Sequence, residues 1–186
     1  MDGWEGFDYA RSRRIKNSLI PIDKVMRFID PSSTDRILEI GAGDGEYAEA
    51  LAKAAHSGVV VAMEFTEAAS KLIEQRIVKS GLKNLELWRM NACLVEDFSK
   101  FEKIFMSDVF HDIECKDRLL EMVHKSAERG MQLILIEFKK SSKIGPPESI
   151  KLSEKQLDGI MSKHGFELLG RIELEQHYMA KYRIAD

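Results

Sequence analysis

The chain has 186 residues, a length that fits one domain, and an ordinary globular composition with 44% hydrophobic and 32% charged residues. Its formal net charge of −3 gives no general attraction for a phosphate backbone, whereas nucleic-acid modules usually carry a basic face. No apolar run approaches the ~20 residues of a membrane span, and residues 1–10 lack the pattern of a signal peptide. We therefore expect a cytoplasmic protein with neither a membrane nor nucleic acid as partner, and its oligomeric state is not indicated.

Residues 1–20 have no clear periodicity, and we interpret them as a preamble to a single domain over residues 21–186. Trp4, Phe7 and Tyr9 are more aromatics than a disordered tail usually holds. They predict that residues 1–18 form a lid over an occupied site, and a tail packed on a sheet edge or simply frayed is the alternative.

Strands and helices then alternate along the chain. A helix is expected from Pro21 to just before Pro31. Apolar, often β-branched runs predict strands at 36–40, 59–64, 85–89, 103–107 and 131–138. Helical spacing of apolar residues predicts helices at 46–56, from Thr66 to Gly81, and through Leu119 and Ala127 to Gly130. This alternation is typical of a doubly wound α/β fold, with a mostly parallel sheet covered on both faces.

The pattern changes near the C-terminal end. Ser153 and Gln156 form a capping box that opens another helix. The runs 166–174 and 177–184 follow, too close together for a crossover helix, so they must pair as a hairpin and one of them must be antiparallel. The predicted fold is therefore a seven-stranded, mostly parallel sheet with one antiparallel strand from a C-terminal hairpin.

The strongest motif is the loop after the first strand, Glu39-Ile40-Gly41-Ala42-Gly43-Asp44-Gly45. Glycines let the backbone turn sharply and let a ligand approach it, and open α/β sheets bind ligands at the carboxyl ends of strands. Glu64 follows the second strand, where a carboxylate can accept hydrogen bonds from ribose hydroxyls, and Phe65 beside it can cover an adenine. The plain alternatives are a tight turn, a solvent-facing helix-start residue and a core aromatic.

The glycine spacing separates two classes of nucleotide site. Dinucleotide enzymes carry GxGxxG, whereas this chain has GxGxG with Glu46 at the position of the third glycine. A negative side chain at the helix start would repel a pyrophosphate, but not a ligand with a sulfonium and no phosphate.

Glu39-x-Gly41-x-Gly43-x-Gly45 resembles the first motif of class I S-adenosylmethionine-dependent methyltransferases, and Val61–Glu64 resembles their second strand with its ribose-binding acid. Asn91-Ala92 is similar to their pair after strand three, and Ser107–His111 to the loop after strand four. The similarity covers about residues 20–186. Phe110–Ile113, Gly145-Pro146-Pro147 and Gly165-Phe166-Glu167 look most like small stand-alone prokaryotic members near the ubiquinone/menaquinone-biosynthesis type.

The resemblance implies S-adenosylmethionine as cofactor and S-adenosylhomocysteine as product. Glu39 would orient the methionine end, Glu64 would hold the ribose, and Asn91, where many relatives have Asp, would read adenine. Ser107 and Asp108 would line the methionyl moiety near the acceptor. The implied cofactor contacts are Glu39, Gly41, Ala42, Gly43, Gly45, Glu64, Phe65, Asn91, Ala92, Ser107 and Asp108.

The acceptor leaves a weaker signature, because methyl transfer from a sulfonium can proceed by alignment alone. His111 is the candidate catalytic base, and a packed or capping histidine is the alternative. The chain lacks the Pro-Pro-aromatic motif of amine-directed nucleic-acid methylases and a Pro-Cys pair, which favours a small-molecule acceptor and leaves protein or RNA open. Two other functions compete with this one. The first is a non-catalytic cofactor-binding module, and the second, less favoured, is a nicotinamide oxidoreductase.

The two cysteines, Cys93 and Cys115, belong to no CxxC or zinc-type array. Isolated cysteines are typical of a reducing compartment, so we expect free thiols that serve as small packing residues. His111 lies four residues from Cys115, but two candidate ligands do not make a metal site, and no metal is expected.

Overall fold

The computed structural model describes residue 8, residue 15 and residues 17–185. The chain divides into two compact units, residues 1–91 and 92–186, called here the N-terminal unit and the C-terminal unit. The lid predicted from Trp4, Phe7 and Tyr9 lies outside the described residues. The single domain over 21–186 stays a prediction.

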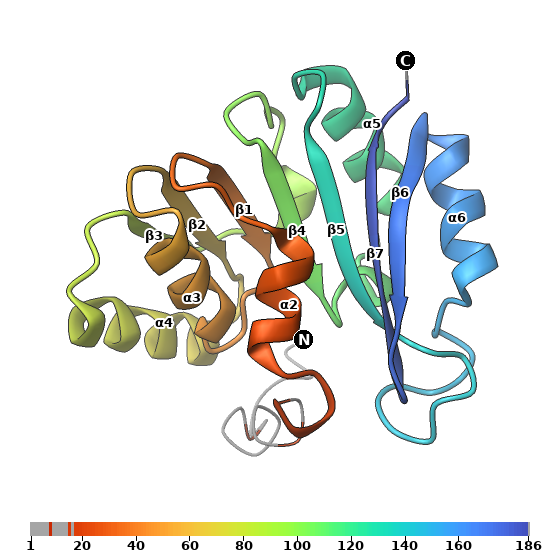
Figure 1. Ribbon diagram of the computed structural model, residues 1–186, viewed down its shortest axis with the longest axis horizontal. Coiled ribbons are helices and arrows are strands. Elements are labelled where there is room, and N and C mark those ends of the chain that lie inside the picture. The colour runs from red at the N-terminus through yellow and green to blue at the C-terminus, as the bar shows by residue number, and fades with distance from the viewer. Residues whose placement is uncertain (1–7, 9–14, 16, 186) are drawn as a thin grey trace. The chain divides into compact units, whose positions relative to one another are not determined.

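The N-terminal unit has three parallel strands in the order β3-β2-β1, with helices packed against them (Figure 1). Helix α3 contacts β2 and β3, α4 contacts β3, and α2 contacts α3. Ile40 pairs with Met63 at the carboxyl ends of β1 and β2, so the loops that leave these strands start side by side. The elements are α2 Ile22–Ile29, β1 Arg36–Ile40, α3 Glu46–Ala54, β2 Val59–Met63, α4 Glu67–Ser80 and β3 Leu85–Trp88.

The C-terminal unit has four strands in the order β4-β5-β7-β6. Strands β4 and β5 are parallel, and β7 runs antiparallel to both of its neighbours, β5 and β6. Phe138 at the end of β5 therefore pairs with His177 at the start of β7. The elements are η1 Ala92–Leu94, β4 Lys103–Ser107, η2 Phe110–Asp112, α5 Lys116–Ser126, β5 Gln132–Phe138, α6 Glu154–Lys163, β6 Phe166–Glu173 and β7 His177–Ile184.

The fold class predicted from the sequence is confirmed: the seven strands belong to a mostly parallel sheet with one antiparallel strand from the C-terminal hairpin. Strands β1 and β4 have the predicted bounds, and the capping box of α6 forms both of its hydrogen bonds. Thr66 stands at the N-cap of α4 but makes no side-chain capping bond. Within the described part of the chain, no helix is long and apolar enough to cross a membrane.

The cysteines differ from the prediction. Cys93 in η1 and Cys115 at the N-cap of α5 form a disulfide, with their Cα atoms 5.8 Å apart, so the expectation of two free thiols is wrong. The pairing depends on the contact between η1 and α5, which a spacing of 22 residues does not reveal. The covalent loop encloses all of β4, and the bond removes Cys115 as a metal ligand beside His111.

Candidate functional site

The glycine loop of the N-terminal unit is held against the end of β2. The backbone amides of Gly41 and Ala42 both donate to the carbonyl of Met63, at 2.9 and 3.0 Å. Gly41, Gly43 and Gly45 have φ values of 69°, 57° and 75°, in the left-handed region that side chains with a Cβ rarely adopt. The alternating glycines are therefore required by the backbone itself.

Gly43 and Gly45 differ in what surrounds them. A Cβ at Gly45 would lie 3.1 Å from Cγ1 of Ile73, so this glycine allows α3 to start close against α4. A Cβ at Gly43 would meet no atom within 4 Å. The loop thus presents open space at Gly43, where a ligand can approach the backbone.

Glu64 joins the two motifs that the sequence singled out. It is buried, with 6% of its surface exposed, so it is not a solvent-facing helix-start residue. One carboxylate oxygen accepts the amide of Gly43 at 3.0 Å, and the other accepts the amide of Thr66 at 2.9 Å. Because each carboxylate oxygen has two lone-pair positions, both can accept a further donor. Phe65 beside it is 58% exposed and is not a core aromatic.

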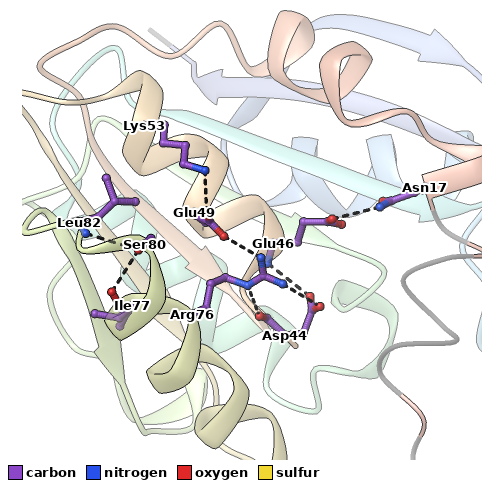
Figure 2. A network of polar contacts seen from close by, with 9 residues as sticks. All are labelled: Asn17, Asp44, Glu46, Glu49, Lys53, Arg76, Ile77, Ser80 and Leu82. Atoms are coloured by element: carbon purple, nitrogen blue, oxygen red, sulfur yellow. Dashed lines mark hydrogen bonds and ion pairs between the residues drawn. The ribbon is translucent and has the colours of Figure 1, made fainter.

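Arg76 of α4 holds the other side of the glycine loop (Figure 2). Its Nε donates to the carbonyl of Asp44 at 2.8 Å, and its second amino group contacts the Asp44 carboxylate at 3.1 Å. The remaining amino group donates to Glu49 of α3 at 2.7 Å. Burial lowers the pKa of Arg76, but Glu49, Asp44 and Glu46 more than offset it, so the pKa is raised. The loop is therefore held from both sides.

Two further predicted contacts belong to this unit. Glu39 lies within β1 opposite Ala62 of β2 and is 2% exposed. Asn91 follows β3 on an exposed segment, where its side chain is accessible. The assigned roles of Glu39 and Asn91 stay predictions.

In the C-terminal unit, the predicted contacts lie at the start of η1 and at the end of β4. Ala92 begins η1 and is buried. Ser107 is 6% exposed, and within the described residues its hydroxyl has no hydrogen-bond partner. Asp108 has a φ of 57°, unusual for a residue with a side chain, and Oδ1 lies 3.4 Å from Nε2 of the buried His177. Ser107 and Asp108 thus place a buried hydroxyl and a carboxylate on a left-handed backbone position at the end of one strand.

His111 lies in η2 with its ring enclosed. Its Nδ1 is 2.6 Å from a carboxylate oxygen of Glu137 on β5, whose other oxygen accepts the His111 amide at 3.2 Å. Nε2 lies 3.4 Å from Asp112. Burial lowers the pKa of His111, but the hydrogen bonds to Asp112 and Glu137 more than offset it and raise the pKa to about 10. Burial raises the pKa of Glu137, so the pair keeps its proton at neutral pH.

This geometry bears on the role predicted for His111. A general base must be unprotonated to accept a proton, so its pKa should lie near the working pH. The environment of His111 instead favours a charged ring that donates to Glu137. The ring is suited to hold a positive charge and to fix the segment after β4. Its service as a base stays a prediction.

Comparisons with known proteins agree with the motifs. A family model described as a methyltransferase domain matches residues 38–131, which is half of the chain and includes the glycine loop, Glu64 and the end of β4. The chain belongs to the class I S-adenosylmethionine-dependent methyltransferases. The family resemblance predicted from the sequence is confirmed.

Two curated relatives of this chain carry names that point to different methyl acceptors. One is the "Probable ribosomal RNA small subunit methyltransferase A" of Methanosphaera stadtmanae, 32% identical over 140 residues, which cover 73% of this chain and 49% of the relative. The other is the ubiquinone/menaquinone biosynthesis C-methyltransferase of Hydrogenovibrio crunogenus, 26% identical over 148 residues, which cover 78% and 57%. The chain thus matches about half the length of these relatives.

A solved structure of a SAM-dependent methyltransferase from Aquifex aeolicus has the same fold as this methyltransferase. The two superpose with a TM-score of 0.85 over 96% of this chain and 100% of the other, at 23% identity. This likeness supports the assignment of the fold.

Sequence reasoning missed three residues with a part in these networks. Arg76 lies 32 positions from Asp44 and carries no motif. Glu137 lies within the apolar run of β5, where a charged residue was the available signal, whereas His177 begins β7 without such a signal. Burying a charge there is costly unless a partner is present, so Glu137 in the run Gln132–Phe138 indicates a nearby proton or cation.

Proposed function

We propose that this methyltransferase transfers a methyl group from S-adenosylmethionine to a small-molecule acceptor. The observation that carries the proposal is the hydrogen bond from Gly43 to Glu64, which joins the glycine loop to the acid of β2. In the family these two motifs hold the methionine end and the ribose. Their joining here supports the same use.

The residues of the N-terminal unit fit the cofactor chemically. The open space at Gly43 admits a ligand to the backbone, and both oxygens of Glu64 can take a further hydroxyl donor. Phe65 offers an exposed ring that can pack on adenine. None of these groups calls for a phosphate, and Asp44 and Glu46 would repel one.

The residues of the C-terminal unit would act on the acceptor side. The cofactor supplies a methyl carbon already activated by a sulfonium, so the chain has to align the acceptor and exclude water. Ser107 offers a buried hydroxyl that can donate or accept, and Asp108 offers a carboxylate. The His111–Glu137 pair holds its proton and fixes the backbone at His111 against β5.

An RNA acceptor is the second candidate, and it rests on the relative named as a ribosomal RNA methyltransferase. The net charge of −3 argues against it, because RNA-binding surfaces draw their affinity largely from basic side chains. The chain matches about half of that relative's length. The small molecule is therefore the better supported acceptor.

Calorimetry tests the cofactor half of the proposal. The protein should bind S-adenosylmethionine and S-adenosylhomocysteine, and it should give no heat with NAD(H) or ATP. Tight NAD(H) binding without S-adenosylhomocysteine binding would refute the proposal in favour of an oxidoreductase.

A transfer assay tests the acceptor half. Labelled S-adenosylmethionine is incubated with the protein and either a small-metabolite extract or purified ribosomal RNA. Label should enter the small-metabolite fraction. Label in the RNA alone would select the second candidate, and binding without transfer to any acceptor would leave a non-catalytic module.

A further inference from the structure

The C-terminal unit contains a hollow in the loop between β5 and α6, which holds none of the predicted cofactor contacts. Its volume is about 690 Å³, within the usual range of small-molecule sites. Lys140, Lys143 and Lys151 line it together with Ser141 and Ser142, and Glu148 is the one carboxylate of the lining. Basic groups therefore dominate a concave surface of a chain whose net charge is negative.

Lys151 is the most informative of the three lysines, because only 5% of its surface is exposed. Its ammonium donates to the carbonyl of Ser142 at 2.7 Å and lies 5.9 Å from the ring centroid of Phe138. A buried ammonium ordinarily has a carboxylate partner, since leaving its charge unpaired is costly.

Such a partner is missing here. Within the described residues, no carboxylate oxygen lies within 4 Å of the ammonium groups of Lys140, Lys143 or Lys151. The neighbouring Lys139, by contrast, is paired with Glu173 at 2.8 Å. The three lysines of the hollow thus leave positive charge available to an anionic ligand.

The loop that carries the lysines is fixed in place. Ser142 and the amide of Lys143 both contact the side-chain oxygen of Gln176, at 2.9 and 3.3 Å. Gly145 has a φ of 80°, and a Cβ there would lie 2.6 Å from the ring of Phe138, so the loop packs closely on that ring. The hollow therefore exists without rearrangement of the chain.

Phe138 connects the hollow to the end of β4. Its ring lies 4.2 Å from that of His177 between centroids, and Nε2 of His177 is 3.4 Å from Asp108. Asp108 is the residue that the family resemblance assigns to the acceptor side of the methionyl moiety. Two side chains, both in the C-terminal unit, thus separate Asp108 from the hollow.

We propose that the lysine-lined hollow of residues 140–151 binds an oxyanion, a carboxylate or a phosphate, of the small-molecule methyl acceptor. That the bound anion belongs to the methyl acceptor rests on the proposed function. The anion site itself is inferred from the three lysines alone. Concavity and the single carboxylate of Glu148 favour a compact anion over an extended phosphate backbone. Phosphate and carboxylate share the chemistry that ammonium groups recognise.

Titration of the full-length protein with inorganic phosphate and with succinate tests the site. Each titration is followed by calorimetry and by the amide NMR signals of Ser141 to Gly145. At least one anion should shift these signals saturably. Lys143→Gln should weaken that binding about 10-fold, the loss expected for one charged hydrogen bond. Lys143 is exposed, so this variant is expected to fold, and Lys151→Met tests the buried ammonium.

Lys139→Gln is the matched control, because it removes the same charge next to the hollow from a lysine paired with Glu173. It should leave anion binding within about twofold of wild type. Saturation by phosphate alone or by succinate alone supports the site and identifies the type of oxyanion. No shift with either anion, or an equal loss in Lys139→Gln and Lys143→Gln, would overturn the proposal.

Two further titrations separate this inference from the proposed function. S-adenosylhomocysteine binding without anion binding would refute the hollow and leave the methyltransferase proposal intact. Anion binding without S-adenosylhomocysteine binding would refute the acceptor role of the hollow together with the proposed function. A single-stranded RNA oligonucleotide that shifts the same amides more strongly than phosphate would overturn the small-molecule assignment.

Discussion

The glycine loop of the N-terminal unit and the cluster after β4 in the C-terminal unit are built from different kinds of contact. In the first, side chains hold backbone: Glu64 accepts two amides, and Arg76 donates to a carbonyl. In the second, the central contact joins two side chains, those of His111 and Glu137, and the same Glu137 also accepts the His111 amide. A loop that is held through its backbone leaves a contiguous glycine motif in the sequence. A pair of side chains, in contrast, comes from two positions that lie far apart in the sequence. The glycine loop can therefore be predicted from the sequence, whereas the cluster after β4 needs the structure.

Gly43→Val should break the first region most severely. The branched side chain would fill the open space at this position and strain a φ of 57° by about 1–2 kcal/mol. We expect S-adenosylhomocysteine affinity to fall about 100-fold or more, measured by calorimetry. Gly130→Val is the matched control, since Gly130 also has a positive φ and open space at its Cβ. Equal affinity in both variants would show that the loop does not face the ligand.

Removing the disulfide should affect the stability of the C-terminal unit. A bond that closes a loop of 22 residues stabilises a fold by about 3 kcal/mol in the chain-entropy model. Cys93→Ser and Cys115→Ser should each lower the free energy of unfolding by about that amount in urea titrations. Reductant should have the same effect on the wild type and none on the double variant. Stability that is insensitive to reductant would contradict the role of the bond.

Glu64→Gln tests whether one carboxylate serves both the loop and the ligand. We expect cofactor affinity to fall by about 1.5–3 kcal/mol, because hydrogen bonds to a charged acceptor are lost. The unfolding free energy should fall by about 1–2 kcal/mol, since the amide nitrogen of Gln would face one of the two backbone N–H groups that the carboxylate accepts. Glu67→Gln, at an exposed neighbour, should change neither quantity. Unchanged affinity in Glu64→Gln would mean that the ribose is held elsewhere.

The His111–Glu137 pair should show its effect in the pH dependence of stability. The folded-state pKa of His111 is raised from 6.5 to about 10, so its contribution is complete below pH 6.5 and is lost as the pH rises towards 10. Imidazole nitrogen NMR should show a protonated ring at pH 8 in the wild type. Glu137→Gln should lower the pKa, whereas the exposed Glu121→Gln should not. A neutral ring at pH 8 in the wild type would restore His111 as a candidate base.

The fold was largely predictable because it follows from local patterns. The bounds of β1 and β4, the hairpin after Phe166 and the capping box at Ser153 all depend on residues close together in the sequence. The contact between Glu64 and Gly43 was accessible only through the family's motifs. Long-range pairs were not accessible: Cys93 and Cys115 are joined because η1 packs on α5, and no spacing rule encodes that contact.

The double hold on the glycine loop has a consequence for recognition. Ordering one backbone residue costs roughly 1–2 kcal/mol in conformational entropy. A loop that became ordered only when the ligand binds would therefore bind it more weakly by that amount. Glu64 and Arg76 fix Gly43 and Asp44 through atoms of the chain itself, so this ordering is completed during folding. Association should then require no loop rearrangement, and a ligand must match the existing shape. Arg76, on a helix without any predicted ligand contact, is therefore expected to influence the affinity through the order of this loop.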